Sequence, residues 1–203
     1  MQYSLPVPAE LTGAHLQHAR LFATRWDLMV ALANRPYERI AEVGVGYGDF
    51  SIHMMAALHP QEFHAYDLFD LHEHPFVLGI PSVTRFQERT HSEYYTQRFP
   101  DAKIYVGDSS ANMNKQPDKY YDLIYIDGAH DYDGVKRDTE SCLRTIKDDG
   151  ILVYNDYTPF DPIAGLPYGV MQAVNDLCVN HGWRMTALAL QPLMFCDVAL
   201  TRG

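Results

Sequence analysis

The sequence predicts an α/β protein: a Rossmann-like, doubly wound and mostly parallel sheet of seven strands, with helices on both faces and an antiparallel hairpin at the C-terminus. Three observations carry this prediction. Apolar, strand-like runs alternate with helical patterns along the chain. A glycine-rich turn follows the first strand of this alternation. Two predicted strands joined by Gln191-Pro192 end the chain as a hairpin, which implies one antiparallel strand.

The first strand and its turn lie in residues 39–50, RIAEVGVGYGDF. The apolar residues of its first half suit a strand that is buried in a parallel sheet. Gly44, Gly46 and Gly48 permit backbone angles and close approaches that a Cβ would forbid. A helix is predicted over residues 49–58, and the amides at a helix N-terminus can bind a polar or anionic ligand group. We therefore expect a cofactor at this turn.

The other elements follow from hydrophobic periodicity and from glycine and proline stops. An amphipathic helix is expected over residues 14–33, ended by Asn34-Arg35-Pro36, and another over residues 83–99. Asp148-Asp149-Gly150 is expected to end a helix over residues 132–147. Further strands are predicted at 62–66, 103–106, 122–126, 150–154, 184–189 and 195–201, and further helical segments at 109–115 and 170–181.

Two segments, 68–100 and 157–168, interrupt the alternation and contain prolines and glycine. We interpret them as insertions on the substrate side of a single domain that covers residues 1–203. With residues 1–35, they are expected to determine specificity. The segment 157–168 directly follows Asp156, the last carboxylate beside a predicted strand end, which makes it the best candidate for a lid that contacts substrate.

The carboxylates at the strand ends predict a site. In open α/β sheets, ligands bind beyond the carboxyl ends of the strands. A single acid at such a position is usually a helix cap or a turn residue. Five in succession make that explanation improbable. The acids are Glu42, Asp67, Asp108, Asp127 and Asp156.

Length and composition restrict the class of protein. The chain has 203 residues, of which 47% are hydrophobic and 21% charged, as expected for one globular domain. Its net charge of −10 and the lack of a basic run argue against a nucleic-acid partner. Three scattered cysteines without a CxxC pair favour a reduced, cytoplasmic protein. We expect no signal peptide in residues 1–10 and no membrane association, because no run approaches about 20 apolar residues.

Two cofactors compete for the glycine turn. A dinucleotide turn has the pattern GxGxxG, and here Asp49 stands where the third glycine would be. Asp67 suits a ribose in either case, because a carboxylate accepts protons from two vicinal hydroxyls. Burial of the acid Glu42 in a strand has an unfavourable desolvation free energy. A cationic ligand group nearby, such as the ammonium of a methionine moiety, would compensate it.

These motifs resemble those of class I S-adenosylmethionine-dependent methyltransferases. Glu42-x-Gly44-x-Gly46-x-Gly48 resembles their first motif, Asp67 the ribose-binding acid, and Gly107-Asp108-Ser109 the adenine-contacting position. The segment 121–132, YDLIYIDGAHDY, is similar to the branch that contains macrocin O-methyltransferase and catechol O-methyltransferase. The resemblance implies that S-adenosylmethionine is bound by Glu42, Gly44, Gly46, Gly48, Asp67, Asp108, Ser109 and Asp127.

The same resemblance implies a divalent metal, usually magnesium, that chelates two oxygens of the substrate. The ligand positions fall on Asp127, Asn155 and Asp156, and Mg²⁺ prefers such hard oxygen ligands. Asn155 departs from the two consecutive aspartates that are common in this branch. The resemblance places the catalytic residues at Asp127 and His130, where a neutral imidazole suits a general base.

The implied reaction is O-methylation of a hydroxylated small molecule, such as a sugar, a polyketide or a phenolic compound. The acceptor oxygen attacks the sulfonium methyl group in line. Three alternatives stay open: an NAD-dependent oxidoreductase or epimerase, a cofactor-binding module without a productive site, and an N- or C-methyltransferase that needs no metal. A homodimer also stays open, because a second subunit would complete a substrate cap on so short a chain.

Overall fold

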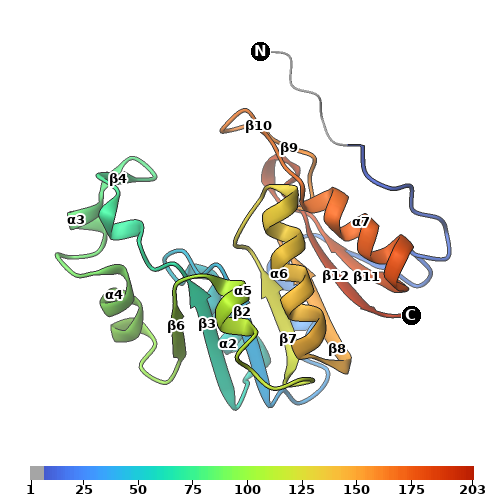
Figure 1. Ribbon diagram of the computed structural model, residues 1–203, viewed down its shortest axis with the longest axis horizontal. Helices are drawn as coiled ribbons and strands as arrows, with labels where there is room; N and C mark the ends of the chain where they lie inside the picture. Colours follow the sequence, from blue (N-terminus) through green and yellow to red (C-terminus); the bar gives the residue numbers. More distant parts are fainter. Residues whose placement is uncertain (1–6) are drawn as a thin grey trace.

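The centre of the molecule is an eight-stranded sheet with the order β1-β11-β12-β8-β7-β2-β3-β6 (Figure 1). This computed structural model describes residues 7–203. Residues 1–6, which belong to the segment expected to lack a signal peptide, lie outside the described residues. The strands of the sheet are β1 Arg20–Phe22, β2 Arg39–Val43, β3 Glu62–Asp67, β6 Lys103–Val106, β7 Tyr121–Ile126, β8 Ile146–Tyr154, β11 Trp183–Ala189 and β12 Asp197–Arg202.

Neighbouring strands of the sheet are parallel, except that β12 runs antiparallel to both β8 and β11. The predicted α/β class, with a mostly parallel sheet and a C-terminal antiparallel hairpin, is therefore confirmed. Strand β2 is buried between β3 and β7, so its apolar residues face packed side chains on both faces of the sheet.

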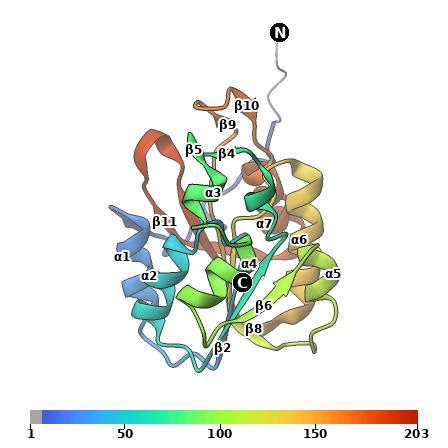
Figure 2. The same cartoon turned by 90° about the vertical axis from the view of Figure 1, so that its left-hand side faces the viewer.

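Helices cover both faces of the sheet, as Figure 2 shows for α1 and α2 on one side and α5 and α6 on the other. The core of one face contains Leu28 and Met54, and the core of the other contains Cys142 and Leu177. The first face carries α1 Arg25–Leu32, α2 Asp49–Leu58 and α4 His91–Arg98, and the second carries α5 Ser109–Met113, α6 Tyr132–Thr145 and α7 Val170–His181. No helix within residues 7–203 has the length and apolar character needed to span a bilayer.

The helix predicted over residues 14–33 is wrong in its first half. Residues 20–22 form β1, which pairs in parallel with β11 and adds an eighth strand to the sheet. The side chain of Thr24 accepts a hydrogen bond from the amide of Asp27 and thereby starts α1 at Arg25. An edge strand of three residues depends on its partner for pairing, and its partner lies more than 160 residues away in the sequence.

The helix predicted over residues 83–99 is split in two. A short helix α3, Ser82–Arg85, ends before Gln87 and Glu88, whose φ angles of 53° and 61° lie in the left-handed region. Helix α4 then begins with a capping box in which Thr90 and Glu93 satisfy each other's backbone amides. The rest of 68–100 forms a 3₁₀ turn, Leu71–Glu73, and a hairpin of β4 Phe76–Val77 and β5 Ile80–Pro81.

Two further boundaries differ from the prediction. Gly150 does not end α6, because β8 begins at Ile146, directly after Thr145. The register between β7 and β8 shifts at this point: Tyr121 pairs with Ile146 and Leu123 with Ile151, so Gly150 lies in a bulge. The segment 157–168 carries a small hairpin of β9 Phe160–Asp161 and β10 Leu166–Pro167.

Candidate functional site

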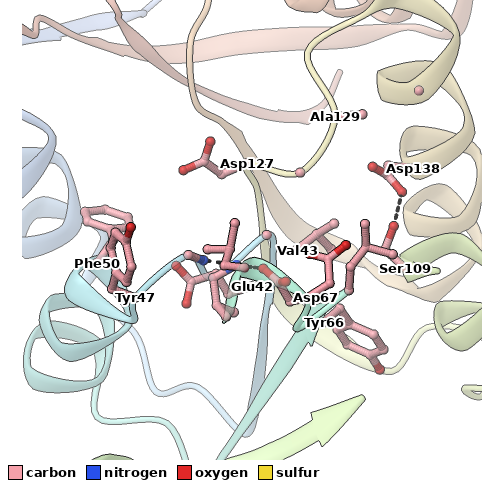
Figure 3. Close-up of a pocket in the computed structure, with 18 of the residues that line it drawn as sticks. Glu42, Val43, Tyr47, Phe50, Tyr66, Asp67, Ser109, Asp127, Ala129 and Asp138 are labelled. Atoms are coloured by element: carbon pink, nitrogen blue, oxygen red, sulfur yellow. Dashed lines mark hydrogen bonds between the residues drawn. The ribbon is translucent and has the colours of Figure 1, made fainter. Parts of the chain in front are cut away.

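A cleft of about 750 Å³ opens at the carboxyl ends of β2, β3 and β7 (Figure 3). The chain leaves β2 toward β3 and β6, and later returns to β7 on the other side of β2. Such a change of direction separates the connections above the sheet and leaves a crevice for a ligand. Seven of the eight residues predicted to bind cofactor line this cleft, namely Glu42, Gly44, Gly46, Asp67, Asp108, Ser109 and Asp127.

The three glycines of the turn differ in what they do. All have positive φ, between 50° and 81°. A Cβ on Gly44 would overlap the backbone of Asp127, so this glycine lets the turn pack against the end of β7. A Cβ on Gly46 would meet open space in the cleft. Gly48 does not line the cleft, because it packs against the ring of Phe99 and caps α2 in a left-handed conformation.

Glu42 is almost fully buried at the end of β2, and its carboxylate borders the cleft. It accepts a hydrogen bond from Ser51 Oγ, which in turn accepts one from Tyr95 Oη at 2.9 Å. Burial raises the pKa of Glu42 well above its usual range, and the bond from Ser51 lowers it only in part. A cationic ligand group in the cleft would compensate the buried charge.

Asp67 connects the end of β3 to the glycine turn. Its Oδ2 accepts from the amides of Val45 at 2.8 Å and Gly46 at 3.4 Å, and its Oδ1 accepts from Phe69 at 2.7 Å. An ionised carboxylate has about four lone-pair sites, so Asp67 keeps acceptor capacity for a ligand hydroxyl.

Asp108 and Ser109 lie at the N-terminus of α5. Asp108 caps this helix by accepting from the amide of Ala111 at 2.7 Å. Ser109 and Ser110 both donate to Asp138, which also lines the cleft (Figure 3). Burial raises the pKa of Asp138, and the hydrogen bonds from the two serines lower it only in part.

A second cluster adjoins the cleft at Asp127. Asp127, His130 and Asp156 each bring one potential ligand atom within 4.8 Å of the others. His130 Nε2 lies 3.1 Å from Asp156 Oδ2 and 3.6 Å from Asp127 Oδ1. Asp156 has a φ of 55°, an uncommon conformation for a residue other than glycine. Backbone outliers of this kind concentrate at functional sites.

The carboxylates determine the protonation of His130. Burial by itself lowers its pKa, but the bonding and charge of Asp127 and Asp156 outweigh burial and raise the pKa to about 9. The ring also stacks on Tyr168 from the segment 157–168, with centroids 4.5 Å apart. Without a cation between the two carboxylates, His130 therefore holds a proton at neutral pH.

Asn155 lies beside this cluster with its amide nitrogen toward Asp127, to which it donates at 2.8 Å. Its amide oxygen accepts from Gln191 at 3.0 Å. The structure thus brings Asp127, Asn155 and Asp156 together at the ends of β7 and β8, as the sequence predicted, whereas the role of Asn155 as a metal ligand stays a prediction.

Residues 41–157 match the sequence model of a family described as a methyltransferase domain. The chain belongs to this methyltransferase family. A comparison with curated protein sequences gave no match.

Solved structures share the fold of this methyltransferase. The O-methyltransferase TomG from Streptomyces achromogenes, involved in tomaymycin synthesis and solved with SAM, has a TM-score of 0.61 at 18% identity, with 88% of this chain and 80% of that chain covered. A ribosomal protein L11 methylase from Lactobacillus delbrueckii subsp. bulgaricus reaches 0.57 at 15% identity, over 88% and 76% of the two chains. A spermidine synthase from Thermotoga maritima reaches 0.55 at 15% identity, over 94% of this chain and 59% of that one.

Sequence reasoning missed one wall of the methyltransferase cleft. Arg25 lines it, with its guanidinium 3.7 Å from the centre of the Phe50 ring and its Nε 3.6 Å from Asp197 Oδ2. Asp197 is fully buried and accepts from Tyr125 Oη at 2.8 Å. The one signal in the sequence was an acid, Asp197, directly before the apolar run Val198-Ala199-Leu200.

Proposed function

We propose that the protein is an S-adenosylmethionine-dependent methyltransferase that methylates a hydroxyl group of a small molecule with the help of a divalent cation. One observation carries the proposal: Asp127 belongs both to the wall of the cofactor-sized cleft and to the cluster with His130 and Asp156. A methyl donor in the cleft and an oxygen acceptor at the cluster would therefore meet beside the same residue.

The cleft fits the donor in size and in chemistry. About 750 Å³ lies within the usual range of cofactor sites. Glu42 offers a buried carboxylate to an ammonium group, Asp67 offers acceptor sites to ribose hydroxyls, and Ser109 lies at the end of the cleft expected to hold adenine. The TomG structure, which has the same fold, is described as a complex with SAM.

The cluster fits a divalent cation. Asp127 and Asp156 supply hard oxygen atoms within 4.8 Å of one another. We propose that Asp127 and Asp156 hold Mg²⁺ or a similar ion. When bound, S-adenosylmethionine would supply the methyl group, and the cation would lower the pKa of the acceptor hydroxyl.

The side chains of the protein would position the acceptor and remove its proton. His130 is the proposed general base, and it can accept a proton only after losing its own. Tyr168 stacks on the His130 ring and so borders the acceptor side. Leu71 and Leu78, from the segment 68–100, line the cleft. We propose that this segment and the segment 157–168 select the small-molecule substrate.

Isothermal titration calorimetry with S-adenosylmethionine and NAD tests the choice of cofactor. We expect S-adenosylmethionine to bind with a Kd in the micromolar range, because Glu42 and Asp67 meet charges and hydroxyls that it carries. Binding of NAD in its place would contradict the proposal and favour the oxidoreductase alternative.

Calorimetry with Mn²⁺ tests the cation site separately. Asp156→Asn keeps a residue that tolerates positive φ but removes one charge, and we expect Mn²⁺ affinity to fall about 10-fold or more while S-adenosylmethionine still binds. Asp149→Asn, an exposed acid outside the cleft, is the matched control. Unchanged Mn²⁺ binding in Asp156→Asn would favour an N- or C-methyltransferase that needs no metal.

A further inference from the structure

The residues around Asn155 form a continuous chain of hydrogen bonds. Arg25 Nη1 donates to Gln191 Oε1 at 3.4 Å, Gln191 Nε2 donates to Asn155 Oδ1 at 3.0 Å, and Asn155 Nδ2 donates to Asp127 Oδ1 at 2.8 Å. The bonds join helix α1, the connection between β11 and β12, the end of β8 and the end of β7.

The chemistry of the residues at the two ends determines the direction of each bond. A guanidinium can only donate, so Gln191 must face Arg25 with its oxygen. The nitrogen of Gln191 then faces Asn155 and the carboxylate of Asp197, to which it also donates. At the other end Asp127 accepts, so Asn155 must face it with nitrogen. Reversal of either amide would set donor against donor and acceptor against acceptor at each of these contacts.

Arg25, the first donor in this series of hydrogen bonds, is held in place by several neighbouring groups. Arg25 donates through Nη2 to Tyr125 Oη, lies over the Phe50 ring, and pairs with Asp197. Tyr125 and Asp197 are both fully buried. A change in the direction of the bonds would therefore require the repacking of buried groups in β7 and β12.

We propose that Arg25, Gln191 and Asn155 form a hydrogen-bond relay that positions Asp127, and that Asn155 acts as a donor to Asp127 and not as a metal ligand. The inference rests on the proposed function only in assigning Asp127 to the cation and acceptor site. The relay fixes one carboxylate oxygen of Asp127, and such outer partners orient ligands and tune metal affinity. All three are positioning residues.

The direction of the bonds can be tested in the whole protein by ¹⁵N NMR of side-chain amides, without cofactor or acceptor. We expect the Asn155 NH₂ protons, assigned by their loss in Asn155→Asp, to exchange with water at least about 10-fold more slowly than those of exposed Asn34. The slow exchange should persist at saturating Mg²⁺. Exchange as fast as that of Asn34, or loss of protection on addition of Mg²⁺, would overturn the relay.

The variant Gln191→Met tests positioning, with Gln61→Met on the exposed surface as its control. We expect Gln191→Met to speed exchange of the Asn155 amide and to weaken Mn²⁺ binding about 10-fold, while S-adenosylmethionine affinity changes less than about 2-fold. Unchanged exchange and Mn²⁺ affinity would refute the relay. If the wild type binds no Mn²⁺, the proposed metal role fails, and the amide exchange still decides the relay.

Discussion

Single residues in this site differ in how much of their bonding capacity is left for a ligand. Asp67 already accepts hydrogen bonds from three backbone amides, and Asp108 accepts the capping hydrogen bond of α5. Glu42 accepts from Ser51, while Arg25 acts on it only through longer-range charge. Of these three acids, Glu42 is the most deeply buried, so a cationic ligand group would stabilise its charge the most.

The variant Glu42→Gln separates binding from stability. We expect S-adenosylmethionine affinity to fall about 10- to 100-fold, because a charge-assisted hydrogen bond to the ammonium is lost. The pKa of Glu42 is raised in the folded protein, so the free energy of unfolding falls as pH rises above the unfolded value of 4.5. Glutamine does not ionise, so the ligand-free variant should melt at a higher temperature than the wild type at pH 7. Calorimetry and thermal melts check both expectations. A variant that binds normally would remove Glu42 from the cofactor site.

At the scale of elements, the turn between β2 and α2 combines two tasks. Gly46 faces the cleft and Gly48 faces the ring of Phe99, although both have positive φ. The backbone amides of Val45 and Gly46 donate hydrogen bonds to Asp67, and these bonds couple the turn to β3. The turn is therefore part of the packing as well as part of the cleft wall.

Alanine at the two positions should have different effects. Gly48→Ala adds overlap with Phe99 to backbone strain, so we expect it to lower the free energy of unfolding by about 2–4 kcal/mol. Gly46→Ala carries strain alone, about 1–2 kcal/mol, but places a methyl group in the cleft and should weaken S-adenosylmethionine binding more than Gly48→Ala does. Urea denaturation and calorimetry measure the two quantities. Equal losses of stability would contradict this division.

Across the whole molecule, Asp197 connects elements that lie far apart in the sequence. It is buried on β12, accepts from Tyr125 on β7, and pairs with Arg25 on α1. Burial raises its pKa to about 7, against the opposing charge of Arg25. The same residues support the relay to Asp127, so stability and the site depend on one network.

The pH dependence of unfolding tests this network. The pKa of Asp197 is about 7 in the folded protein and 3.8 in the reference state, so the folded protein binds the proton more tightly and loses stability as pH rises from about 4 to 7. The loss is at most about 4 kcal/mol. Asp197→Asn should reduce this slope in urea denaturation, whereas exposed Asp133→Asn should keep it. An identical slope in both variants would show that Asp197 titrates normally.

Local patterns in the sequence were sufficient for much of the fold. The strand, turn and helix at residues 39–58 were predicted within a residue, because hydrophobic periodicity and glycine requirements are properties of neighbouring residues. Strand β1 and the start of β8 were not, because an edge pairing and a bulge depend on partners elsewhere in the sheet.

The sequence by itself determined the mostly parallel α/β fold and the gathering of Glu42, Asp67 and Asp127 at one edge of the sheet, since parallel strands bring their carboxyl ends together. Only the tertiary structure decided which way Asn155 points and how Arg25 and Gln191 reach Asp127. Those contacts join residues up to 166 positions apart, and hydrogen-bond direction depends on the partners that packing supplies.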